Sequence, residues 1–152
     1  MPKRTVIFFC LLSLFVGLLL GGFLFKDTRP RSFLALPDCG STCLKRSELA
    51  GIAASIGIRF VPGLIPDVIL ETEKSVAFQS PDPLARIDYL IVPKKDIRDL
   101  GDLSTEDAEY VKDAFQVISQ LVRDNKLHRY KVIANGPGFQ QLNYLHFHVV
   151  AE

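Results

Sequence analysis

The sequence is poor in the side chains that usually mark redox, metal or nucleic-acid chemistry. Its 152 residues include no tryptophan, one methionine, three cysteines and three histidines. Three cysteines do not indicate a disulfide framework. The 18 basic and 17 acidic side chains leave a formal net charge of +1. A net charge of +1 does not supply the basic surface that nucleic-acid binding requires, so we expect no nucleic-acid partner.

Charge is absent from one long run near the N-terminus. Residues 6–25 read VIFFCLLSLFVGLLLGGFLF. Twenty helical residues at about 1.5 Å each span roughly the 30 Å hydrocarbon core of a bilayer. We therefore predict a single-pass transmembrane anchor over residues 1–25, with membrane contact through residues 6–25. A cleaved signal peptide, which needs only about 7–15 apolar residues, and a buried soluble helix are the alternatives.

The charges that flank this run bear on orientation. Lys3 and Arg4 precede it, and Lys26, Arg29 and Arg31 follow it. Because positive charge is enriched on the cytoplasmic side, this count favours a cytoplasmic C-terminal domain by a small margin.

Residues 26–44 contain two prolines and no sustained periodicity, which predicts a tether between membrane and domain. Cys39 and Cys43 lie in this segment and form either a small disulfide outside the cell or two free thiols inside it. As metal ligands they would need two partners at suitable distance. We interpret them as linker thiols and expect neither a metal nor a cofactor.

Residues 45–152 predict one α+β domain. Apolar residues at helical spacing predict a short helix that ends near Gly57, and a stronger helix is capped by Ser104 and Asp107 and stops at about residues 124–125. The stronger helix has one apolar stripe: Val111, Ala114, Phe115, Ile118, Leu121 and Val122. Strands are predicted over residues 67–70, 75–79, 87–92, 130–134 and 144–150. Runs of strands without strict helix alternation favour a mostly antiparallel sheet.

The last predicted strand carries two of the three histidines. Because side chains alternate along a strand, Tyr144, His146 and His148 share one face, and Leu145 and Phe147 face the core. The histidine Cβ atoms would lie about 6.5–7 Å apart, which suits two imidazoles holding one phosphate. The alternative is a half-exposed strand with histidines on its wetter side.

Three segments of the domain match the motifs of one known family in order. IPDVILETEKSVAFQSPDP is similar to an opening hairpin and nucleotide loop, YLIVPKKDI to a strand ending in I-P-K-K-H, and YKVIANGPGFQQLNYLHFHVV to a strand–loop–strand ending in H-x-H-x-H. These segments, over about residues 64–150, resemble the histidine triad (HIT) family of nucleotide hydrolases and transferases. The resemblance implies a HIT-like five-stranded sheet with two helices and a homodimer whose sheets join edge to edge.

The resemblance also implies roles for individual residues. His146 corresponds to the middle histidine, which attacks the α-phosphate and becomes nucleotidylated, and His148 corresponds to the last histidine, which helps hold the phosphate. The implied substrate contacts are Asn135, Gln140 and Gln141 at the phosphate and ribose, and Ser80 and Pro81 at the nucleoside.

The sequence departs from the family pattern at several of these positions. Tyr144 replaces the first histidine, where its phenol can donate a hydrogen bond to phosphate without supplying charge. Asp88 and Asp96 stand where many members have histidine, Gln141 replaces a serine, and Ser80 replaces an acid. A buried Asp88 would either orient an imidazole or raise the electrostatic cost of binding phosphate.

Two functions remain open at this point. The first is a hydrolase or transferase of a purine nucleotide or nucleoside phosphoramidate that works through a nucleotidyl-His146 intermediate. The second is a catalytically degenerate HIT domain that serves as a membrane-tethered nucleotide-binding or protein-interaction module.

Overall fold

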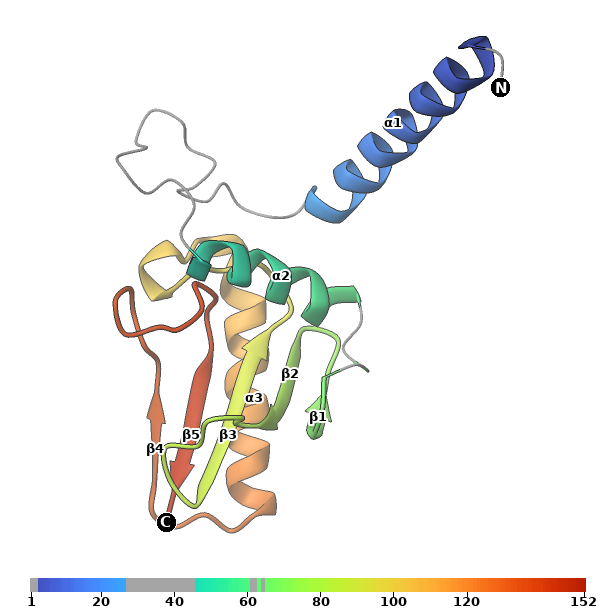
Figure 1. Ribbon diagram of the computed structural model, residues 1–152. Coiled ribbons are helices and arrows are strands. Elements are labelled where there is room, and N and C mark those ends of the chain that lie inside the picture. Colours follow the sequence, from blue (N-terminus) through green and yellow to red (C-terminus); the bar gives the residue numbers. More distant parts are fainter. Residues whose placement is uncertain (1–2, 27–45, 61–62, 64) are drawn as a thin grey trace.

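The computed structural model describes residues 3–26, 46–60, 63 and 65–152. Nearly all of the predicted tether, with Cys39 and Cys43, lies outside the described residues. The described helices and strands are α1 (Lys3–Phe25), α2 (Arg46–Phe60), β1 (Val68–Glu71), β2 (Ser75–Gln79), β3 (Ile87–Pro93), α3 (Ala108–Asp124), β4 (Tyr130–Ile133) and β5 (Phe147–Ala151) (Figure 1).

Helix α1 contains the whole charge-free run. Its segment Thr5–Phe25 has a mean hydropathy of 2.6, and none of its apolar window is buried. By length and composition this helix could cross a membrane.

The five strands form one antiparallel sheet in the order β1-β2-β3-β5-β4. This arrangement confirms the predicted α+β class. The predicted strand over residues 144–150 is wrong at its start, because β5 begins at Phe147. The Leu145 amide instead donates to the Ile97 carbonyl at 2.7 Å, so the segment before β5 bonds to the loop after β3.

Helix α3 covers one face of the sheet, behind the strands in Figure 1. Its buried residues are Ala114, Val117, Ile118 and Leu121, which follow the i, i+3, i+4, i+7 spacing of one helix face. The prediction placed Phe115 in the apolar stripe, but its side chain is 50% exposed. It lies at the margin of the core, where its ring centroid is 5.2 Å from that of Phe147. The capping box of Ser104 and Asp107 is confirmed, with a short 3₁₀ turn, Thr105–Asp107, before α3 begins.

Helix α2 crosses one end of the opposite face (Figure 1), where Ile58 packs with Val76, Val92 and Tyr144. It runs to Phe60, so the predicted end near Gly57 is wrong. A glycine inside a helix costs about 1 kcal/mol relative to alanine. Burial of Ile58, one residue beyond, stabilises the added turn and offsets that cost.

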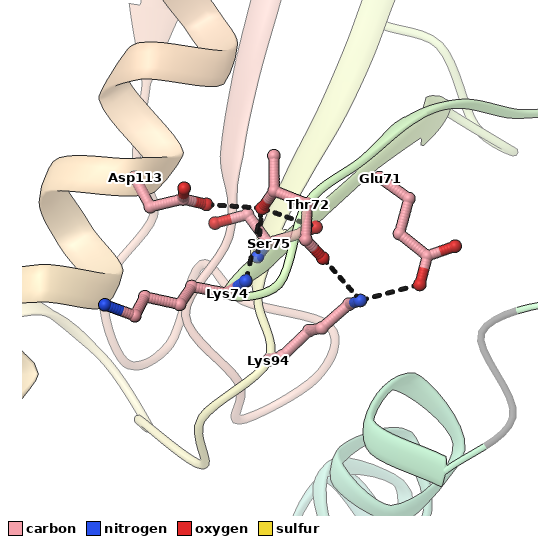
Figure 2. Close-up of polar contacts among 6 residues, drawn as sticks. All are labelled: Glu71, Thr72, Lys74, Ser75, Lys94 and Asp113. Atoms are coloured by element: carbon pink, nitrogen blue, oxygen red, sulfur yellow. Dashed lines mark hydrogen bonds and ion pairs between the residues drawn. The ribbon is translucent and has the colours of Figure 1, made fainter.

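The turn between β1 and β2 is fastened to both α3 and β3 (Figure 2). The Thr72 hydroxyl donates to Asp113 of α3 at 2.6 Å and accepts the backbone N–H of Ser75 at 2.8 Å. Lys94 donates to Glu71 and to the Thr72 carbonyl, both at 2.6 Å. The first lysine of the Pro-Lys-Lys motif therefore anchors the hairpin.

Candidate active site

A cavity of about 270 Å³ lies on the face of the sheet opposite α3. Its walls come from α2, the loop between β2 and β3, and the loop after β4, and its floor comes from the sheet. Seven of the eight site residues expected from the sequence line it: Ser80, Pro81, Asn135, Gln141, Tyr144, His146 and His148. Gln140 does not, because its side-chain amide donates to the Arg98 carbonyl at 3.3 Å.

The alternation of β5 sets the direction of its histidine. Phe147 and Val149 are buried in the core against α3, and His148 between them faces the cavity. His146, just before the strand, reaches the same cavity, and the two imidazole centroids lie 5.3 Å apart with their planes at 70°. The structure thus brings both histidines to one small volume.

The proton position on His146 follows from its hydrogen bond. Its Nδ1 lies 2.7 Å from the Tyr144 carbonyl oxygen. Because a carbonyl only accepts, Nδ1 carries the hydrogen, and the lone pair of the neutral ring is on Nε2. Burial lowers the pKa of His146 below its ordinary 6.5, against a smaller upward effect of that hydrogen bond. His146 is therefore neutral at pH 7 with an available nitrogen lone pair.

His148 has a different partner. Its Nδ1 lies 2.9 and 3.1 Å from the two carboxylate oxygens of Asp88. Asp88 is completely buried and comes from β3, two residues before Leu90, which pairs with His148 across the sheet. Asp88 also accepts the backbone N–H of Leu84 at 2.9 Å. This buried carboxylate thus holds the ring of the second histidine.

Tyr144 is 2% exposed, and its hydroxyl is directed at the backbone. The phenol oxygen lies 2.7 Å from the Pro93 carbonyl and 3.0 Å from the Lys95 carbonyl. Its ring contributes to the cavity wall. Tyr144, whose backbone carbonyl bonds to His146, is therefore held at the end of β3 by its own hydroxyl.

Replacing Tyr144 with phenylalanine should lower the free energy of unfolding by about 1–2 kcal/mol, because the single phenolic hydrogen that lies between the Pro93 and Lys95 carbonyls is lost. Urea unfolding of the full chain in detergent measures the loss. Tyr89→Phe, which removes a solvent-exposed hydroxyl bond to Asn125, is the matched control and should change it by less than about 0.5 kcal/mol. Equal unfolding free energies for Tyr144→Phe and the parent chain would contradict the role of the hydroxyl.

Several cavity residues carried no sequence signal. Ala54 and Ile58 line the cavity from α2, and Leu84, Phe139 and Leu142 line it from loops. Apolar residues in such positions are not distinguished from core residues by pattern alone. The described lining residues include no lysine or arginine. Within the described ranges, no group of three or more histidine, cysteine or acidic residues is placed to hold a metal ion.

Comparisons with known proteins agree with this geometry. A family model described as "Scavenger mRNA decapping enzyme C-term binding" matches residues 64–152. An uncharacterized HIT-like protein of Chlamydia muridarum is 29% identical over 104 residues, which cover 66% of this chain and 82% of that protein. The crystal structure of a HIT family hydrolase from Legionella pneumophila Philadelphia 1 has a TM-score of 0.56 and 26% identity, covering 61% of this chain and 88% of that one.

A third relative has a named activity. The bifunctional adenosine 5′-phosphosulfate phosphorylase/adenylylsulfatase of Arabidopsis thaliana is 33% identical over 84 residues, which cover 52% of this chain and 56% of that protein. The fold is that of a HIT hydrolase-like domain. The chain belongs to the domain family of the matched model and, with these relatives, to the histidine triad family.

Proposed function

We propose that this protein is a membrane-anchored HIT hydrolase that cleaves a purine nucleoside 5′-phosphate derivative, such as a phosphoramidate. The observation that carries the proposal is the hydrogen bond from His146 Nδ1 to the Tyr144 carbonyl, which leaves the Nε2 lone pair for the cavity. A neutral, fixed imidazole is a competent nucleophile toward phosphorus near pH 7.

The reaction divides into two displacements. His146 Nε2 attacks the α-phosphorus, the bond from phosphorus to the leaving group breaks, and the leaving amine takes up a proton from solvent. Water then attacks the phosphorus and returns a proton to solvent, which releases His146 and forms the nucleoside 5′-monophosphate. His148 lies beside His146, and Asn135 and Gln141 line the same cavity, so all three are placed to hold phosphate and ribose oxygens.

The charges of the cavity support a substrate with a single phosphate. Its described lining includes Asp82 but no lysine or arginine, and Asp88 lies just behind His148. A polyphosphate would bring several negative charges to a site in which, among the described lining residues, the cationic candidates are the imidazoles. The name of the Arabidopsis relative refers to adenosine 5′-phosphosulfate, which is also a nucleoside 5′-phosphate derivative.

We also propose that α1 and the tether hold the domain at a membrane, on the cytoplasmic side. The charge-free run of residues 6–25 within α1 supports the anchor. Protease treatment of right-side-out and inverted vesicles tests the orientation, and digestion of the domain from outside intact cells would contradict it.

We further propose that two copies pair through β4, which lies at the edge of the sheet and exposes Tyr130 and Val132. Light scattering of the detergent-solubilised chain should give twice the chain mass, after correction for detergent. A monomer mass would contradict the pairing.

The second candidate function is a nucleotide-binding module without turnover. The substitution at Tyr144 favours it, because the hydroxyl bonds to Pro93 and Lys95 and the site lacks one imidazole of the family pattern. Calorimetry would then show nucleotide binding with no covalent adduct.

The test that separates the two functions uses the full chain in detergent with adenosine 5′-phosphoramidate. The hydrolase predicts release of adenosine 5′-monophosphate and an acid-labile adduct on His146, detected by intact mass after rapid quenching. Binding without turnover or adduct in folded protein would support the module. Neither binding nor turnover would contradict both.

The lowered pKa of His146 sets the expected pH dependence. The nucleophile is active when neutral, so activity is lost as the pH falls through its folded-state pKa. Because burial places that pKa below 6.5, the acid limb of kcat/KM should have its midpoint below about 6.5. Initial rates from about pH 5 to 8 measure it, and a midpoint above 6.5 would contradict the assignment.

A further inference from the structure

We propose that Asp88 is a positioning residue that joins the nucleoside-side loop of the cavity to His148. In this role its carboxylate holds His148 as the tautomer with the hydrogen on Nδ1 and, through the same group, closes the loop between β2 and β3. The catalytic consequence rests on the proposed function, whereas the positioning of the ring does not.

The contacts of Asp88 form one junction. Its carboxylate oxygens lie 2.9 and 3.1 Å from His148 Nδ1, and Oδ2 lies 2.9 Å from the backbone nitrogen of Leu84. The Ser80 amide donates to the Asp88 carbonyl oxygen at 2.9 Å. Two hydrogen bonds therefore close the loop from Ser80 to Asp88. One joins the backbones of these two end residues, and the other joins the Asp88 side chain to the Leu84 backbone.

The same loop forms one wall of the cavity, through Ser80, Pro81, Asp82 and Leu84. Asp88 itself is completely buried, and His148 is 8% exposed. A buried carboxylate requires hydrogen-bond donors, and these two N–H groups supply them. The Asp88 side chain thus positions both the loop that would contact the nucleoside and the His148 ring that would contact the phosphate.

The proton position on His148 follows from this junction. A carboxylate only accepts, so Nδ1–H donates to it, and Nε2 is the ring nitrogen left for the cavity. Fixing the tautomer of a catalytic imidazole by a buried carboxylate is the arrangement that orients histidine in catalytic triads.

The substitution Asp88→Asn tests the junction because an amide has only one acceptor oxygen. An amide nitrogen in the place of Oδ2 would lie 2.9 Å from the Leu84 nitrogen. With the nitrogen in the place of Oδ1 instead, the amide oxygen accepts the Leu84 N–H and lies 3.1 Å from His148 Nδ1, so the polar atom nearer to the ring, at 2.9 Å, is the amide nitrogen. The Leu84 N–H has no alternative protonation state, whereas an imidazole can move its hydrogen to Nε2. We therefore expect His148 to change tautomer in this variant.

Nitrogen NMR of the full chain in detergent, with ¹⁵N-labelled histidine, reads the tautomer directly. The chain has three histidines, and His128→Gln and His148→Gln assign the signals. In the parent chain, His148 Nδ1 should be protonated at neutral pH. In Asp88→Asn it should become an unprotonated, pyridine-type nitrogen, with hydrogen on Nε2. Asp82→Asn, the same change in the same loop, should leave the tautomer of His148 as in the parent chain.

The activity measurement is separate. If the proposed function holds, Asp88→Asn should lower kcat for adenosine 5′-phosphoramidate at least about tenfold. With Nδ1–H on the carboxylate, His148 donates to phosphate from Nε2 only as an imidazolium, and the neutral amide neither fixes that ring nor balances its charge. An unprotonated Nδ1 in the parent chain would overturn the positioning role. If the variant does not fold, the parent spectrum alone decides. A parent chain with the expected tautomer but no turnover would support the positioning and overturn the proposed hydrolase.

Discussion

Replacing His146 with alanine should lower turnover of adenosine 5′-phosphoramidate by at least about 10³-fold and remove the covalent adduct. The reason is that the variant lacks the nitrogen that forms the bond to phosphorus, and catalysis through a covalent intermediate has no substitute route. Steady-state rates and intact mass after rapid quenching measure the two effects. The loss should appear in kcat, since the cavity walls that bind the nucleoside are unchanged.

His128→Ala is the matched control for this experiment. His128 is the one histidine of the sequence outside the cavity, and it is exposed in the segment that precedes β4. Its removal should leave the rate within about twofold of the parent chain, because surface substitutions usually change stability by less than about 0.5 kcal/mol. Equal activity of His146→Ala and the parent chain would exclude His146 as the nucleophile.

The parts of the fold and candidate site that the sequence predicts are those set by local periodicity. Alternation along β5 placed His148 on the face opposite Phe147 and Val149, and the structure confirms this separation. The hairpin of β1 and β2 and the capping box at Ser104 also depend on residues a few positions apart. Each of these patterns is determined by residues close together in the sequence, so it can be recognised without the tertiary structure.

The parts that the sequence leaves open depend on contacts between distant segments. The Asp88–His148 bond joins positions 60 residues apart, and the Tyr144 hydroxyl reaches Pro93, 51 residues away. From the sequence alone, Asp88 could therefore either orient an imidazole or oppose phosphate binding. The Tyr144 phenol was open to a role as a hydrogen-bond donor to phosphate. The wall from α2 is a similar case, because Ala54 and Ile58 show helical spacing alone, and only packing places them beside the histidines.

Filling the cavity from α2 should have the second large effect. Ala54 lines the cavity and is partly buried against the packed face of the sheet. A tryptophan there would occupy part of a volume of only about 270 Å³ and exclude the nucleoside. We expect kcat/KM for adenosine 5′-phosphoramidate to fall about 100-fold, or roughly 2.7 kcal/mol, chiefly through KM. The series Ala54→Val, Ala54→Leu and Ala54→Trp should raise KM progressively.

Ala53→Trp is the matched control, because Ala53 is the preceding residue of the same helix and is exposed. It introduces the same side chain into α2 without entering the cavity, so KM should remain within about twofold of the parent value. Circular dichroism of each variant separates exclusion of substrate from loss of fold. If Ala54→Trp folds and retains the parent KM, the nucleoside binds outside this cavity. If both tryptophan variants raise KM equally, the effect belongs to α2 as a whole, and the cavity wall at Ala54 has no specific role in binding.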